Sequence, residues 1–261
     1  MSGAAVPPYP PGHQLLAGKS VLVTAAAGTG IGFATARRCV EEGAVVTVSD
    51  LHERRLDEAA EQLTRLSGRR PATALCDVTV EEQVQRMFEV AIAATGHLDV
   101  LVNNAGLGGT ANLVDMTDAQ WSRVLDVTLN ATFRCTRAAL RHMIPRRAGV
   151  IVNNASVLGW RAQAGQAHYA AAKAGVMALT RCAAIEAAEA GVRVNAVAPS
   201  LAMHPFLSKV TSEEVLAALV AREAMGRAAE PWEVANVIVF LASDLSSYMT
   251  GEIISVSSQH P

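Results

Sequence analysis

The chain has 261 residues, of which 51% are hydrophobic and 18% are charged, and its formal net charge is −2. This composition is typical of a globular protein, and the length fits one large α/β domain. The small net charge gives no electrostatic case for binding nucleic acid or an anionic membrane, and no apolar run reaches the roughly 18 residues that a membrane span requires.

Residues 1–15 contain four prolines and predict a disordered, Pro-rich tail. The tail lacks the basic and apolar regions of a signal peptide, so we expect a cytoplasmic protein. The four cysteines are widely spaced with no Cys-x-x-Cys pair, which favours reduced thiols. The seven histidines are scattered and none has metal-ligand spacing, so no metal is expected.

Strand-like and helix-like segments alternate along residues 16–261. The expected strands are 20–24, 44–50, 72–78, 98–106, 149–156, 192–200 and 252–258. The expected helices are 30–44, 53–66, 81–95, 117–144, 167–190 and 231–243. This alternation predicts an α/β protein with a parallel sheet and helices on both faces. There is no internal repeat or linker, so we expect a single domain, in which the mixed segment 201–229 forms a substrate lid.

Polar residues gather where six of the expected strands end. Ligands of open parallel sheets bind beyond the carboxyl ends of the strands, so these clusters indicate a site at one edge of the sheet. The clusters are Ala25–Thr29, Asp50, Asp77, Asn103–Gly106, Asn154–Ser156 and Pro199–Ser200.

The stretch VLVTAAAGTGIG at 21–32 joins a strand to a helix through glycines. Gly28 and Gly30 would let the backbone approach a pyrophosphate at the helix N-terminus, although a tight turn alone would also use them. Asp50 ends the next strand about 20 residues later, where a carboxylate accepts the ribose hydroxyls of NAD and repels a 2′-phosphate. A helix N-cap is the alternative role for Asp50.

Tyr169 and Lys173 are four residues apart in an expected helix, so both side chains lie on one face. An ammonium near a phenol stabilises the phenolate and lowers the tyrosine pKa. Chance seldom produces this pair in a chain with only three tyrosines. Ser156 ends the fifth expected strand, where its hydroxyl could bind a substrate oxygen beside Tyr169.

These residues, with CDV at 76–78, NNAG at 103–106 and NAVAPS at 195–200, resemble the short-chain dehydrogenase/reductase family in its single-domain branch. The resemblance covers nearly the whole chain from Leu16. It implies a Rossmann fold with a doubly wound, seven-stranded sheet over residues 16–261. It also implies interconversion of a secondary alcohol and a ketone by hydride transfer with NAD, or less favourably NADP, usually in a homotetramer.

The resemblance assigns roles by position. Tyr169 is the acid/base, Lys173 binds the nicotinamide ribose and lowers the tyrosine pKa, and Ser156 orients the substrate oxygen. The implied cofactor-binding residues are Gly28, Thr29, Gly30, Ile31, Asp50, Asp77, Val78, Asn104, Ala105, Gly106, Tyr169, Lys173 and Pro199.

Four departures from the family pattern stand out. Ala25 replaces the first loop glycine and the loop has one extra residue, which we expect Gly28 to absorb with a positive φ. Thr128 aligns with the family's catalytic Asn, and its hydroxyl could hold a relay water instead. Ser200 replaces a glycine, and His204 replaces a threonine that contacts the cofactor.

The stretches AAAGTGIG, NNASVLGWRAQ and the terminal SVSSQ resemble an actinobacterial subgroup of the family. That subgroup acts on a hydroxylated bicyclic ketoacid from steroid rings, carried as its CoA thioester. Alternatives are a 3-oxoacyl thioester reductase, a sugar or polyol dehydrogenase and, in another class, a non-catalytic NAD-binding regulator. Arg134, Arg137 and Arg141 form a helical stripe that is either a CoA phosphate site or a solvated face.

Overall fold

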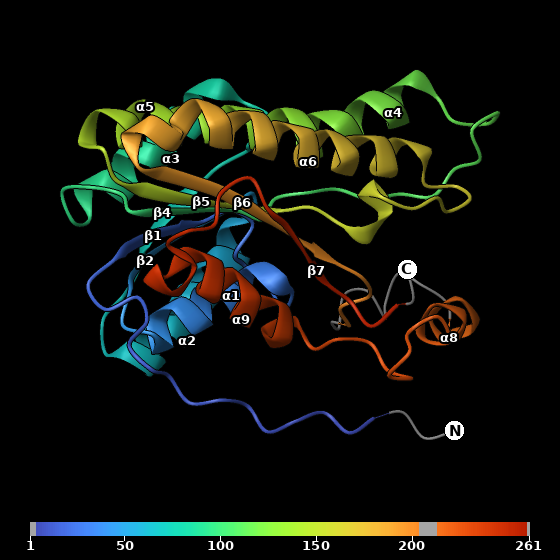
Figure 1. The fold of residues 1–261 in the computed structure, drawn as a ribbon, viewed down its shortest axis with the longest axis horizontal. Helices are drawn as coiled ribbons and strands as arrows, with labels where there is room; N and C mark the ends of the chain where they lie inside the picture. The colour runs from blue at the N-terminus through green and yellow to red at the C-terminus, as the bar shows by residue number, and fades with distance from the viewer. Residues whose placement is uncertain (1–3, 204–212, 260–261) are drawn as a thin grey trace.

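A seven-stranded parallel sheet forms the centre of the computed structural model, which describes residues 4–203 and 213–259 (Figure 1). The strand order is β3–β2–β1–β4–β5–β6–β7, which confirms the predicted doubly wound Rossmann fold. The strands are β1 (Ser20–Val23), β2 (Val45–Asp50), β3 (Ala72–Leu75), β4 (Val100–Asn103), β5 (Gly149–Asn154), β6 (Val192–Pro199) and β7 (Ile253–Val256).

Helices cover both faces of this sheet, as Figure 1 shows. One face carries α1 (Ile31–Glu41), α2 (Glu53–Ser67) and α9 (Pro231–Ala242). The other face carries α3 (Glu81–Ala93), α4 (Asp118–Leu125), α5 (Ala131–Arg146) and α6 (Ala167–Ala187). The short helix α8 (Glu213–Val220) lies outside these two layers.

Alternate residues of the central strands enter opposite halves of the core, because successive side chains of a strand point to opposite faces. Leu22 and Leu101 pack with α3, α5 and α6, whereas Val21 and Val102 pack with α1, α2 and α9. Both halves are apolar, so the central strands appear in the sequence as continuous hydrophobic runs rather than alternating ones.

The helix expected over 117–144 is divided in the structure. A π-helical turn at Asp126–Asn130 separates α4 from α5. Thr128 is fully buried at the centre of this turn, and the hydroxyl of Thr132 donates to the Thr128 carbonyl at 2.8 Å. Single π-helical turns occur often at functional sites, and this one faces the loop that follows β4.

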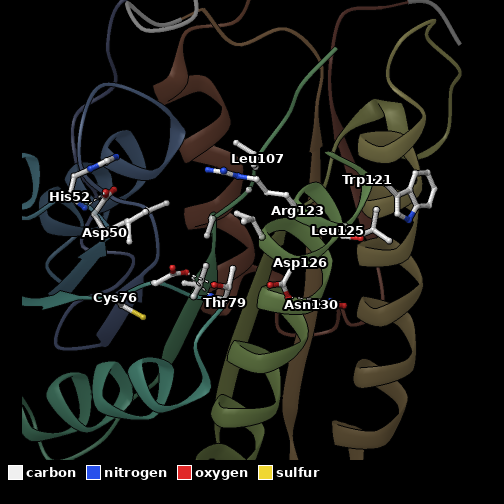
Figure 2. A pocket seen from close by; sticks show the side chains of 18 of the residues that line it. Asp50, His52, Cys76, Thr79, Leu107, Trp121, Arg123, Leu125, Asp126 and Asn130 are labelled. Atoms are coloured by element: carbon white, nitrogen blue, oxygen red, sulfur yellow. Dashed lines mark hydrogen bonds between the residues drawn. The ribbon is translucent and has the colours of Figure 1, made fainter. Parts of the chain in front are cut away.

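A cavity of about 1080 Å³ opens where β1, β2, β3 and β4 end (Figure 2). Loop residues that follow these four strands line one side, and residues of α4 and the π-helical turn line the other. The fold therefore creates this cavity at the sheet edge where the sequence placed the polar clusters.

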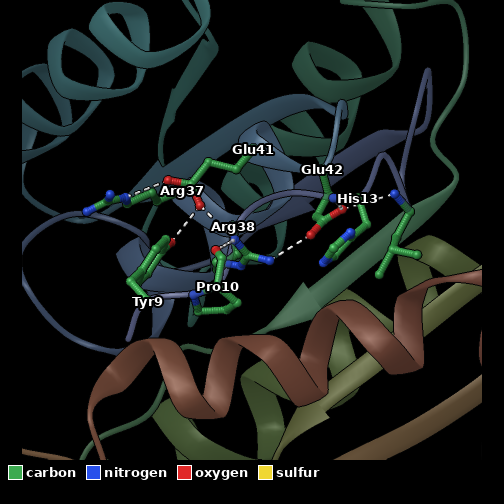
Figure 3. Close-up of polar contacts among 8 residues, drawn as sticks. Tyr9, Pro10, His13, Arg37, Arg38, Glu41 and Glu42 are labelled. Carbon is green, nitrogen blue, oxygen red and sulfur yellow. Dashed lines mark hydrogen bonds and ion pairs between the residues drawn. The ribbon is translucent and has the colours of Figure 1, made fainter. Parts of the chain in front are cut away.

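The N-terminal tail differs from the expected disorder, because residues 9–15 contact the end of α1 and Trp232 of α9 (Figure 3). The Tyr9 hydroxyl donates to Glu41 at 2.6 Å, and the Tyr9 ring packs edge-on against Trp232, with their centroids 5.3 Å apart. Arg38 donates to the Pro10 carbonyl at 3.1 Å. Aromatic and charged contacts thus fix a segment whose prolines alone suggested an unbound chain.

Candidate active site

The loop between β1 and α1 has a backbone that few residues other than glycine adopt. Gly28 has a φ of +101°, as expected for the residue that absorbs the inserted position. Ala25 also lies in the left-handed region, with a φ of +49°. The Asn104 side-chain amide donates to the carbonyls of Thr24 and Ala25 at 3.2 and 3.0 Å, which holds this conformation.

Space around the loop glycines fits a phosphate group. An added Cβ at Gly32 would collide with the Ala25 carbonyl oxygen and the Asn104 amide, so only glycine fits at this second position of α1. An added Cβ at Gly28 or Gly30 would meet no heavy atom within 4 Å, so the N-terminus of α1 stays open. Open backbone amides at a helix N-terminus favour an anion. Thr29 and Ile31 lie in the same turn.

Replacing Ala25 with Gly should stabilise the protein by about 0.5–1 kcal/mol, because Ala is strained at a positive φ and Gly is not. Denaturant unfolding of the purified protein measures this difference. Ala27→Gly is the matched control, since Ala27 lies in the same loop outside the positive-φ residues, and it should destabilise. A loss of stability in Ala25→Gly as large as in the control would contradict the strain.

The lining of the large cavity brings together five of the predicted cofactor residues: Asp50, Asp77, Val78, Ala105 and Gly106. The Asp50 carboxylate accepts the backbone N–H groups of Ala27 at 3.2 Å and His52 at 3.0 Å. Burial raises the pKa of Asp50, and the Ala27 N–H and the positive charge of Arg55 oppose that rise. A buried acceptor beside an open helix N-terminus fits the ribose and pyrophosphate of NAD(P).

Three of the predicted cofactor residues, Asn104, Asp77 and Pro199, already have partners within the chain. The Asn104 side chain is directed to the β1 loop and accepts from Asn154 at 3.0 Å. The Asp77 carboxylate accepts from the backbone and hydroxyl of Thr79 at 2.9 and 2.7 Å. Pro199 ends β6 and pairs in register with Val256. Their expected contacts with the cofactor stay predictions.

Ser156, Tyr169 and Lys173 come together at the carboxyl end of β5, where the sequence placed them. Ser156 follows β5 and its Oγ accepts the Leu158 N–H at 3.2 Å, which fixes the serine side chain. The Ser156 side chain lies close enough to Tyr169 on α6 to favour the phenolate. The Lys173 Nζ lies 5.5 Å from the centre of the Tyr169 ring. The three groups thus form one connected cluster.

Burial dominates the electrostatics of this cluster. Lys173 is 3% exposed, and burial lowers its pKa to about 8. Its ammonium donates to the Asn154 carbonyl, a partner that the sequence interpretation missed. Burial raises the pKa of Tyr169, and the nearby Ser156 side chain opposes this rise. The direction is thus opposite to the lowering expected from Lys173, because removal from water disfavours the phenolate.

Thr128 lies beside the cluster, but its hydroxyl is already committed. It donates to the Leu107 carbonyl at 3.1 Å and accepts the Leu107 N–H at 3.0 Å. A hydroxyl has one proton, so Thr128 cannot donate to a relay water in this arrangement. The threonine instead links the loop after β4 to the π-helical turn. Gly106 lies in the same loop, and a Cβ added to Gly106 would lie 3.4 Å from the Lys173 Nζ.

Two further sequence interpretations concern the substrate. Arg134 and Arg137 pair with Asp126 at 2.9 Å and Glu81 at 2.7 Å, which favours a solvated, ion-paired face over a phosphate site. Of the proposed lid over 201–229, residues 204–212 lie outside the described part of the chain, and His204 is among them.

Comparisons with known proteins agree with this geometry. A family model described as enoyl-(acyl carrier protein) reductase matches residues 25–258. A crystal structure of a short chain dehydrogenase from Mycobacterium smegmatis superposes with a TM-score of 0.88, with 58% identity over 98% of this chain and 99% of that one. The chain belongs to the short-chain dehydrogenase/reductase family. It is therefore an oxidoreductase that interconverts alcohol and ketone groups with NAD(P).

Two relatives carry more specific names. A Mycobacterium tuberculosis protein named (5R,7aS)-5-hydroxy-7a-methyl-1-oxo-2,3,5,6,7,7a-hexahydro-1H-indene-carboxyl-CoA reductase is 65% identical over 251 residues, which are 96% of each chain. A cis-4-hydroxycyclohexanecarboxylate dehydrogenase from Sinomonas cyclohexanicum is 44% identical over 90% of this chain and 94% of its own. No helix in the described part of this short-chain dehydrogenase is long and apolar enough to cross a membrane.

Proposed function

We propose that this enzyme interconverts the hydroxyl and ketone forms of a steroid-derived bicyclic acyl-CoA. The observation that carries the proposal is the likeness to the Mycobacterium tuberculosis hexahydroindene-carboxyl-CoA reductase, which extends over nearly the full length of both chains. Ser156, Tyr169 and Lys173 supply the alcohol–ketone chemistry that such a substrate requires.

The chain's own residues move the proton. When bound, NAD(P) supplies the hydride donor or acceptor. In alcohol oxidation, the Tyr169 phenolate takes the hydroxyl proton while Ser156 holds the same oxygen. In ketone reduction, the Tyr169 phenol returns that proton. Lys173, held by the Asn154 carbonyl, places a positive charge beside Tyr169 and would hold the nicotinamide ribose of the bound cofactor.

We propose NAD as the cofactor, because a 2′-phosphate would meet the Asp50 carboxylate in the cavity. Gly28, Thr29, Gly30 and Ile31 would receive the pyrophosphate at the N-terminus of α1. We also propose a cytoplasmic homotetramer, as the family resemblance implies. Size-exclusion chromatography with light scattering measures the oligomeric state.

The substrate proposal predicts a ranking of activities. With NAD, the enzyme should oxidise the hydroxylated bicyclic acyl-CoA with a kcat/KM about a hundredfold above linear 3-hydroxyacyl-CoAs, because a shaped ring pocket supplies about 3 kcal/mol of discrimination. Nicotinamide absorbance measures each rate. Faster turnover of linear 3-hydroxyacyl thioesters would instead support a 3-oxoacyl thioester reductase, and faster turnover of sugars or polyols would support a sugar or polyol dehydrogenase. Tight NADH binding without turnover of any alcohol would favour the alternative that the protein is a non-catalytic NAD-binding regulator.

A further inference from the structure

A buried carboxylate lies outside the catalytic cluster, on the segment that follows α8. Glu223 is 4% exposed and accepts three hydrogen bonds from neutral donors. These donors are the Leu201 N–H at 3.3 Å, the Ser258 hydroxyl at 2.9 Å and the Gln259 side-chain amide at 3.0 Å. Glu223 therefore connects two segments: it bonds to Leu201 in the segment after β6 and to Ser258 and Gln259 in the C-terminal segment.

Gln259 forms hydrogen bonds with both Glu223 and Arg161. An Arg161 Nη donates to the Gln259 Oε1 at 2.6 Å, while the Gln259 Nε2 donates to Glu223. The cation and the carboxylate fix the Gln259 amide in one orientation between them. Within residues 4–203 and 213–259, no carboxylate forms an ion pair with Arg161. Its remaining N–H groups can bind an anion.

Arg161 is held close to the alcohol-binding serine. Its N–H donates to the Val157 carbonyl at 3.0 Å, so Arg161 lies one turn beyond Ser156. Gln259 follows β7, whose residue Val256 pairs with Pro199 at the end of β6. The Arg161–Gln259 hydrogen bond thus joins the segment after β5 to the segment after β7, at the carboxyl-end edge of the sheet where Ser156 also lies. It also joins two of the stretches that resemble the actinobacterial subgroup, NNASVLGWRAQ and SVSSQ.

We propose that Arg161 binds an anionic group of the substrate and that Gln259 and Glu223 are its positioning residues. This inference rests on the proposed function, because the anion is a carboxylate of a bicyclic acid or a phosphate of its CoA thioester. A guanidinium binds either group through paired N–H···O bonds. Gln259 neutralises none of its charge, so the cation stays available for the ligand.

Three forms of one substrate test the proposal: the hydroxylated bicyclic free acid, its CoA thioester and its uncharged N-acetylcysteamine thioester. Arg161→Ala should raise KM for the anionic form that Arg161 binds by about tenfold to a hundredfold, with kcat within about twofold. Its KM for the uncharged thioester should stay unchanged. Arg161→Lys should recover part of the loss, and Gln259→Ala should give an intermediate one. Arg65→Ala, on the exposed side of α2, is the matched control.

The pattern of losses identifies the anion. A loss confined to the CoA thioester assigns Arg161 to a phosphate, and a loss confined to the free acid assigns it to the carboxylate. Equal losses for all three forms, or none, would overturn the inference. If the wild-type enzyme oxidises none of them, the proposed function fails separately. Calorimetric binding of the free acid and of CoA then tests Arg161, and equal affinities in wild type and Arg161→Ala would reject its role.

Discussion

Tyr169→Phe should lower kcat for alcohol oxidation by about 10³-fold, because the variant has no group at that position that can accept the hydroxyl proton. The ring and its packing are kept, so the dissociation constant for NADH should change by less than about twofold. Steady-state rates and fluorescence titration with NADH measure the two quantities. Tyr248→Phe is the matched control, since Tyr248 is fully exposed, and it should behave as wild type.

The pH dependence separates the acid/base role of Tyr169 from a structural one. Because burial raises the pKa of Tyr169, the phenol persists to higher pH than in a free tyrosine. Oxidation needs the phenolate, so its rate should rise with pH through the alkaline range, while ketone reduction should fall. The residual rate of Tyr169→Phe should lack this dependence. Wild-type turnover in Tyr169→Phe, or an unchanged profile, would end the assignment.

The parallel sheet and its two helix layers could be predicted from local patterns in the sequence, whereas the doubly wound Rossmann fold was predicted from the family resemblance. Apolar runs such as VLV at 21–23 and VLVN at 100–103 are buried on both faces, and helices alternate with them. The helix break at Asp126–Asn130 could not be predicted. It depends on the partner of the Thr128 hydroxyl, Leu107, which is 21 residues away in the chain.

The catalytic cluster followed from two local spacings, since helix geometry places Tyr169 and Lys173 on one face. The direction in which the Tyr169 pKa shifts could not be predicted in the same way, because residue spacing shows which groups are close but not how far they are buried from solvent. The same limit applies to Tyr9. Its contacts with Glu41 and Trp232 join segments that are distant in sequence, so a Pro-rich stretch with no local partner looked disordered.

Asp50→Asn should shift the preference between NAD and NADP by about a hundredfold toward NADP, since like charges about 5 Å apart repel by about 3 kcal/mol at an effective dielectric of 20. NADP carries a 2′-phosphate. The negative charge of Asp50 is offset in part by backbone N–H groups and by Arg55. Removing the negative charge leaves Arg55 in the same cavity, where it can pair with that phosphate. The ratio of kcat/KM values for the two cofactors measures the shift.

Asparagine keeps the shape of the side chain and an acceptor oxygen for one of the two N–H groups, Ala27 or His52, which bond to different oxygens of Asp50. The carboxyl end of β2 should therefore stay folded with the loss of one hydrogen bond. Asp57→Asn is the matched control, because Asp57 is an exposed acid on α2 outside the cavity, and it should leave the cofactor ratio unchanged. Adding Arg55→Ala to Asp50→Asn should remove part of the gain for NADP, since the phosphate then loses its cation. If wild type already prefers NADP, or if Asp50→Asn leaves the ratio unchanged, Asp50 does not select the cofactor and the ribose lies elsewhere in the cavity.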